Sequence, residues 1–139
     1  MKFFLTIFIL FSSVTLYSQQ LGEVKNGLHT LKLHKVNNEF SITYSDVKSE
    51  SVLDEHTFKF PYEKTVYNLM MYGFNKQREH QLIIQTSTDT IVKFEYKKIL
   101  GKWMLKIKQN NLKYKKHTSS TFFTKSHIIT LFDQPELFY

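Results

Sequence analysis

The residues most capable of chemistry in this chain are lysines gathered in one quarter of it. Ten lysines and one acid, Glu95, lie between Lys93 and Lys125, and this stretch carries a formal charge of +9. The rest of the chain after residue 18 carries a small negative charge. Lysine ammonium groups bind anionic surfaces as point charges. The stretch therefore predicts contact with an anionic partner or, as the alternative, a solvated lysine-rich surface.

The turns that interrupt this stretch predict how its lysines share a sheet face. Gly101-Lys102 has the pattern of a type II′ turn and Asn110-Asn111 that of a second two-residue turn. These turns would place Lys97 opposite Lys106, Lys106 opposite Lys115, and Lys108 between Glu95 and Lys113. The predicted anion-binding residues on this face are Lys93, Lys97, Lys106, Lys108, Lys113 and Lys115. The opposite face would form a core wall from Tyr96, Leu100, Trp103, Leu105, Ile107 and Tyr114.

The favoured partners are an anionic polysaccharide or lipid phosphate. Nucleic acid is not favoured, because the aromatic side chains alternate to the core side, where they form no exposed stacking platform. The single arginine, Arg78, also lies outside the basic stretch. Apolar residues at the Gly101 turn, flanked by lysines, suggest a hairpin tip that dips into an anionic membrane: Ile99, Leu100 and Met104. The favoured alternative is that a neighbouring helix covers them.

A second function class is a pocket module. Its helix and sheet would hold an apolar or small ligand around Phe74, Tyr96, Trp103 and Tyr114. A cavity of about 300 Å³ or more between helix and sheet would favour this class.

Catalytic and metal signals are weak. No pair of histidines has a zinc spacing such as HExxH, and the chain has no cysteine, so we predict no metal and no cofactor. The cluster Asp54-Glu55-His56 has residue types that could act in general acid–base catalysis, but we interpret it as solvated loop residues. A hydrolase built from distant acids, with Glu23, Asp46 and Asp89 as candidates, is a less favoured third class. We therefore predict a non-enzymatic binding domain.

The elements that position these residues are strands and two helices. Strands over 28–36 and 39–46 flank an Asn37-Asn38 turn, and Leu33 would oppose Ile42. A helix should follow from Pro61 to about Lys76, and Gly73 within it would allow close approach to the sheet. Three or four strands follow, and a helix over 125–133 is capped by Thr124. The fold class is α+β, an antiparallel meander sheet of about five to six strands with both helices on one face.

The first 18 residues predict the destination. A basic start, an apolar run over Phe3 to Phe11, and a polar region ending at Ser18 have the layout of a secretory signal peptide. We expect cleavage near Ser18 and a single domain over 19–139 with no transmembrane anchor, exported to the periplasm or the extracellular space. Composition without cysteine and rich in lysine, asparagine, isoleucine and phenylalanine suggests a bacterial protein. The sequence does not indicate an oligomeric state.

Overall fold

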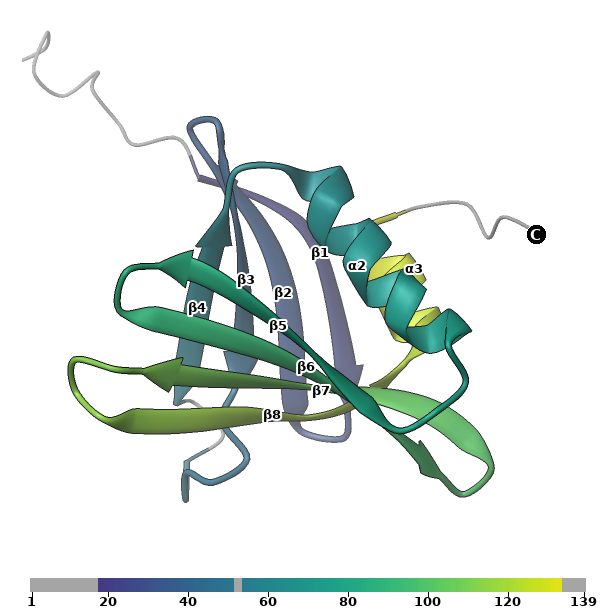
Figure 1. Cartoon of the computed structure of the whole chain (residues 1–139). Helices are drawn as coiled ribbons and strands as arrows, with labels where there is room; N and C mark the ends of the chain where they lie inside the picture. Colours follow the sequence, from purple (N-terminus) through teal and green to yellow (C-terminus); the bar gives the residue numbers. More distant parts are fainter. Residues whose placement is uncertain (1–17, 52–53, 134–139) are drawn as a thin grey trace, which may run out of the picture.

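The computed structural model describes residues 18–51 and 54–133, which form an α+β fold (Figure 1). Four strands and a helix follow one another twice along the chain. The first set is β1 (Ser18–Asn26), β2 (His29–Val36), β3 (Glu39–Ser45), β4 (Glu55–Phe60) and α2 (Glu63–Asn75). The second set is β5 (His80–Ser87), β6 (Thr90–Ile99), β7 (Lys102–Asn111), β8 (Lys116–Thr124) and α3 (Lys125–Leu131).

The strands form two antiparallel sheets of four strands each, in the orders β1-β2-β3-β4 and β5-β6-β7-β8. The sequence predicted one sheet of about five to six strands. This number was too low because two strands, β1 and β4, were not predicted. The pairing of β1 with β2 shifts between Gln20 and Gly22, and this irregularity interrupts the alternation of its side chains. β4 begins at Glu55, within the Asp54-Glu55-His56 segment that we interpreted as solvated loop residues, and only Phe58 and Phe60 of this strand are buried.

The β2–β3 hairpin has the predicted register. Leu33 pairs with Ile42 and Leu31 with Tyr44, and these four side chains are fully buried. Asn37 at the tip has a φ of 57°, a left-handed conformation that asparagine tolerates. Turn chemistry and alternation agree at this hairpin, and the prediction is confirmed.

The β6–β7 hairpin turns one residue earlier than predicted. Leu100 and Gly101 are the central residues of the turn, with φ values of 50° and 83°, and Ile99 pairs with Lys102. Two positive φ values are the mark of a type I′ turn rather than type II′. The sequence rule failed here because it does not expect leucine in a left-handed conformation.

The new register corrects the predicted lysine pairs. Lys97 does not lie opposite Lys106; Glu95 does, and Lys93 lies opposite Lys108. The register has moved by two residues, and such a shift leaves each side chain on its own face of the sheet. These four lysines and Glu95 therefore still share the outer face.

The β7–β8 turn also differs from prediction. β7 runs on to Asn111, and the turn occupies residues 112–115. The Asn111 side-chain oxygen accepts hydrogen bonds from the backbone N–H groups of Lys113 (3.1 Å) and Tyr114 (3.0 Å). Lys113 and Lys115 lie in this turn, so neither opposes a lysine of β7 as predicted. Tyr114, predicted in the core wall, is 71% exposed.

Helix α2 lies within the predicted range. Met70, Gly73 and Phe74 are on its buried face. A Cβ atom added at Gly73 would lie 2.0 Å from the ring of Tyr96 in β6, and the Tyr96 hydroxyl donates to the carbonyl oxygen of Met70 at 2.7 Å. Glycine thus allows the close helix–sheet approach that the sequence suggested.

Helix α3 begins at the predicted cap. The Thr124 hydroxyl accepts from the His127 N–H at 3.2 Å, and His127 Nδ1 accepts from the Thr124 N–H at 3.0 Å, which completes a capping box. Ile128, Leu131 and Phe132 are buried, as predicted. The helix ends at Leu131, two residues before the predicted end.

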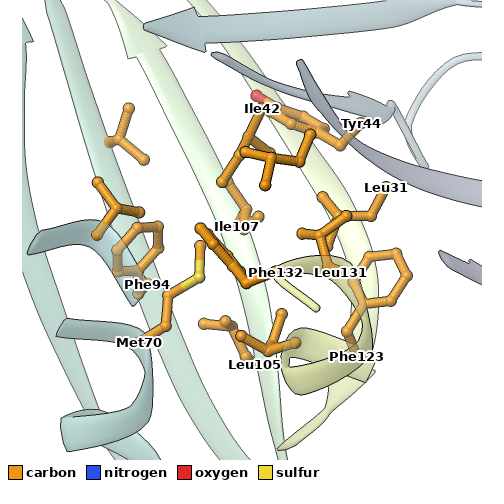
Figure 2. Close-up of a cluster of buried hydrophobic side chains, with 14 of the residues drawn as sticks. Leu31, Ile42, Tyr44, Met70, Phe94, Leu105, Ile107, Phe123, Leu131 and Phe132 are labelled. Carbon is orange, nitrogen blue, oxygen red and sulfur yellow. The ribbon is translucent and has the colours of Figure 1, made fainter. Parts of the chain in front are cut away.

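The core lies between the two sheets and the two helices. Figure 2 shows side chains of both sheets converging with those of α2 and α3; those labelled are Leu31, Ile42, Tyr44, Met70, Phe94, Leu105, Ile107, Phe123, Leu131 and Phe132. The Tyr44 hydroxyl of the first sheet donates to Gln109 Oε1 at 3.0 Å and lies 2.6 Å from Thr118 Oγ1. This hydroxyl joins the first sheet to β7 and β8 of the second.

Each helix packs on the sheet that it does not follow. α2 follows β4 but contacts β5, β6 and β7, and α3 follows β8 but contacts β1 more than any other strand (Figure 1). A Cβ atom added at Gly22 of β1 would lie 2.0 Å from the carbonyl oxygen of Leu131. The helices therefore tie the two sheets into one core.

The predicted leader, residues 1–18, lies outside the described residues except for Ser18, the first residue of β1. Its cleavage stays a prediction. Within 18–51 and 54–133, neither helix is long and apolar enough to cross a lipid bilayer.

Candidate anion-binding face

Four of the six predicted lysines lie together on the outer face of β6 and β7. Lys93 and Lys97 come from β6, and Lys106 and Lys108 come from β7. The other two, in the 112–115 turn, lie beyond the paired part of β7 and β8. The structure therefore brings together the four predicted lysines of β6 and β7, but it does not place Lys113 and Lys115 beside them.

The one acid in this group is buried beneath two of the lysines. Glu95 is 6% exposed, its Oε1 lies 3.1 Å from Lys97 Nζ, and its Oε2 contacts Lys108 Nζ. Burial acts to raise the pKa of Glu95, but the hydrogen bonds and charges of Lys108 and Lys97 outweigh it and lower that pKa. Glu95 is thus ionised at neutral pH and offsets one of the charges around it.

Lys106 shows the cost of gathering these charges. Its pKa is lowered, first by burial and then by the charge of Lys108, although the Glu95 carboxylate opposes the shift. Its Nζ lies 5.2 Å from the centre of the Phe122 ring. The face therefore holds this ammonium group less favourably than water would, and a bound anion would relieve the repulsion.

A fifth lysine joins the face from the loop after β3. Val47 N–H donates to the Ser119 carbonyl at 2.9 Å, and Ser119 N–H donates to Asp46 Oδ1 at 3.2 Å, so this loop is fixed along β8. Asp46 Oδ1 also accepts from the Lys48 N–H at 3.1 Å. Sequence reasoning missed Lys48, because the contact joins segments that lie 73 residues apart.

We call Lys48, Lys93, Lys97, Lys106 and Lys108 the lysine face. A hollow of about 200 Å³ lies on it, and three of its lysines line that hollow. The full lining is Lys48, Lys93, Lys108, Gln109, Asn110, His117, Thr118 and Ser119. Ammonium groups beside amide and hydroxyl groups are the donors that bind a phosphate or sulfate oxygen.

A cluster of possible metal ligands lies beside the loop that carries Lys48. Asp46, Asp54 and His56 each bring a ligand atom within 4.8 Å of the others, the one such group among the described residues. His56 Nε2 lies 3.4 Å from Asp54 Oδ1 and 3.9 Å from Asp46 Oδ2. Because Asp46 Oδ1 already accepts two backbone N–H groups, we interpret the cluster as an anchor for the loop rather than as a metal centre.

The acids proposed for a hydrolase lie on separate elements. Glu23 is in β1, Asp46 follows β3, and Asp89 is in the β5–β6 turn. Asp46 instead lies close to a second carboxylate, that of Asp54, and neither residue lines the 200 Å³ hollow.

A larger pocket of about 450 Å³ lies where the end of α2, the start of β7 and the start of α3 meet. Two residues of the predicted ligand pocket, Phe74 and Trp103, line it, but Tyr96 and Tyr114 do not. Its full lining is Phe74, Asn75, Gln77, Lys102, Trp103, Thr124, Lys125, Ser126 and Ile129. Three apolar side chains, Phe74, Trp103 and Ile129, beside two lysines are suited to a small amphipathic molecule.

Comparison with known proteins adds no further constraint. Family models, curated proteins and solved structures gave no match to the chain.

Proposed function

We propose that the protein is an exported, non-enzymatic binding domain whose lysine face contacts an anionic partner, either a polysaccharide or lipid phosphate. The observation that carries the proposal is that five lysines share one face with a single carboxylate, which two of them engage, while three of them line a hollow. Four of those lysines come from β6, the strand of Glu95, and from its neighbour β7. The fifth, Lys48, comes from the loop after β3 and lines the hollow with Lys93 and Lys108.

The energetics of the face support a partner. Lys93 and Lys108 are directly opposed, and such like-charged pairs destabilise a sheet by roughly 0.2–1 kcal/mol. The lowered pKa of Lys106 points the same way. A domain retains unfavourable local interactions most readily where they serve binding. An anion in the hollow would convert the repulsion into attraction.

The test is retention on immobilised dextran sulfate and polyphosphate across a salt gradient. The variant replaces three lysines with glutamine, K93Q, K106Q and K108Q, and the matched control replaces three on the outer face of the first sheet, K25Q, K32Q and K59Q. Each set includes one lysine paired with a glutamate. We expect retention to fall with salt in the native protein, because counterions are released on binding.

We expect the lysine-face variant to lose most of its retention, while the first-sheet control keeps it. Equal losses in the two variants would mean that only net charge matters, and the proposal would be wrong. Both variants must unfold at temperatures close to that of the native protein for the comparison to hold.

The 450 Å³ pocket favours a second candidate function, binding of a small apolar or amphipathic ligand. Trp103 is the single tryptophan, so its fluorescence reports directly on this pocket. We expect 1-anilinonaphthalene-8-sulfonate to quench it and the I129N variant to weaken the effect. The control is I83N, because Ile83 is 62% exposed on another strand. Equal quenching in all three proteins would count against this candidate.

Export is tested separately. We expect the protein recovered from outside the cytoplasm to have the intact mass of a chain beginning near Gln19. Recovery of the uncleaved chain in the cytoplasm would contradict this part of the proposal.

A further inference from the structure

The tip of the β6–β7 hairpin presents an apolar side chain with no cover. Leu100 is 100% exposed, the highest value among the large apolar side chains of residues 18–51 and 54–133. The sequence predicted it in the core wall or beneath a helix, and both predictions are wrong. Its φ of 50° is one that a leucine rarely adopts. A glycine or asparagine would suit this position better on conformational grounds.

Exposed lysines surround this leucine on both strands. Lys97 and Lys98 precede it and Lys102 follows it, and all three are exposed. Lys98 lies on the side of the hairpin that carries Tyr96, yet it reaches solvent, because the hairpin extends past the core (Figure 1). The one carboxylate on these strands, Glu95, is already engaged with Lys97 and Lys108.

This combination distinguishes a lipid surface from a soluble polyanion. A polyanion offers nothing to an apolar side chain, whereas a bilayer offers anionic phosphates and, just below them, an apolar layer. A second copy of the chain is not favoured as the occupant, because three lysines on each tip would repel one another.

We propose that the β6–β7 hairpin tip docks on an anionic membrane surface, with Leu100 inserted at the boundary between headgroups and acyl chains. Lys97, Lys98 and Lys102 would lie at the level of the lipid phosphates. This inference goes beyond the proposed function, because it depends on the hairpin tip and not on the hollow of the lysine face. The contact is peripheral and reversible, since it uses one apolar side chain and a few charges.

The experiment measures partitioning of the full chain onto vesicles by co-sedimentation, with Trp103 fluorescence as the reporter. One set of vesicles is pure phosphatidylcholine and the other contains phosphatidylcholine and phosphatidylglycerol in roughly a 7:3 ratio, so that their surface potential is negative. We expect binding only to the anionic vesicles, with a blue shift of the Trp103 emission, because this residue lies close to the tip.

The decisive variant is L100N, which suits the turn and is therefore expected to fold. We expect it to reduce partitioning about tenfold, since it removes the burial of a leucine side chain. The matched control is L28N, because Leu28 is 77% exposed in the β1–β2 turn of the first sheet. Binding by L28N should equal that of the native protein. Equal binding by L100N and the native protein would overturn the inference.

Two further variants separate this site from its rivals. We expect K98Q with K102Q to reduce partitioning about thirtyfold, because each lysine near an anionic surface contributes about 1 kcal/mol. The K93Q/K106Q/K108Q variant should keep the blue shift and its dependence on Leu100. Loss of vesicle binding in the K93Q/K106Q/K108Q variant would place the membrane contact on the lysine face. Loss of vesicle binding in Y114N would place it at the 112–115 turn. Either result would overturn the inference.

Discussion

The two sheets have the same strand order and opposite surface chemistry. The outer face of the first sheet pairs its charges: Lys32 Nζ lies 3.1 Å from Glu55, and Glu23 lies opposite Lys32. Neighbouring hydroxyls there also bond, with Thr43 and Thr57 2.7 Å apart. The outer face of the second sheet gathers lysines around Glu95 alone. Because the first sheet balances its charges in the same architecture, the imbalance of the second is not required by the fold.

The two helices also differ, because each packs mainly on the sheet that it does not follow in the chain. α2 approaches β6 through Gly73, a glycine of the helix, whereas α3 approaches β1 through Gly22, a glycine of the strand. At Gly73 the obstacle to a Cβ atom is the ring of Tyr96, and at Gly22 it is a backbone carbonyl oxygen. A ring can shift by rotation, but a helix carbonyl can move only with the helix.

The largest effects should therefore come from alanine at these glycines. We expect G22A to destabilise the protein by about 3 kcal/mol, at the upper end of overpacking costs. G73A should cost less, about 1–2 kcal/mol, because the gain in helix propensity of about 1 kcal/mol offsets part of the clash. Denaturant unfolding measures both. A stabilised G73A protein would contradict the close approach to Tyr96, and so would an equal cost for G73A in a Y96L background.

The next effect sharpens the contrast between the two outer faces. We expect E95Q to lower the free energy of unfolding by about 1 kcal/mol, a value discounted because Lys97 and Lys108 are partly exposed and screened. Because the pKa of Glu95 is lowered from 4.5 by folding, its contribution is present above 4.5 and is lost as the pH falls through the folded-state pKa. E95Q should also strengthen retention on dextran sulfate.

The control is E55Q, which breaks the ion pair of the first sheet with Lys32. It should change both stability and retention less than E95Q, because Glu55 is more exposed than Glu95. If E95Q weakened retention, Glu95 would be a residue that organises the site rather than one that offsets its charge.

A smaller, pH-dependent effect distinguishes the two helices. α3 begins with a capping box that needs unprotonated His127 Nδ1, whereas α2 begins without a side-chain cap. Burial lowers the pKa of His127 from 6.5, so the unfolded chain takes up the proton first. Stability from this group is therefore lost as the pH falls below 6.5. H127Q keeps an acceptor at this position and should remove that part of the pH dependence, measured by thermal unfolding between about pH 7 and 5.

The smallest effect compares the two hairpin tips. Asn37 and Leu100 both adopt left-handed conformations, with φ values of 57° and 50°. We expect L100N to raise the melting temperature by a few degrees and N37L to lower it by a similar amount, because asparagine tolerates this conformation better than leucine. A lower melting temperature for L100N would show that Leu100 stabilises the fold, and its exposure would then need another explanation.

These turns also explain how far the sequence could predict the structure. The first hairpin was predicted correctly because an asparagine occupies its left-handed position. The β6–β7 turn was predicted one residue too late, because Leu100 adopts the left-handed conformation before Gly101. The β7–β8 turn was misplaced because Asn111 accepts hydrogen bonds with its side chain and Lys115 has the positive φ. The alternation of side chains along β6 and β7 was still predicted correctly. Lys93, Lys97, Lys106 and Lys108 therefore lie on the predicted face, although their cross-strand partners differ.

The parts of the site that the sequence could not predict depend on contacts between distant segments. Lys48 joins the lysine face because Asp46 and Val47 bond to Ser119 on β8. Two of the eight described strands, β1 and β4, were missed because the alternation of β1 is interrupted and β4 is short. Neither feature has a local signal that would place it in space.

The most direct test of the central claim is retention on dextran sulfate, compared between K93Q/K106Q/K108Q and K25Q/K32Q/K59Q at equal net charge. We expect the second-sheet variant to lose its retention and its salt dependence, and the first-sheet variant to behave as the native protein does. Equal retention by the two variants would contradict it, because the lysine face would then be only one part of a uniformly basic surface.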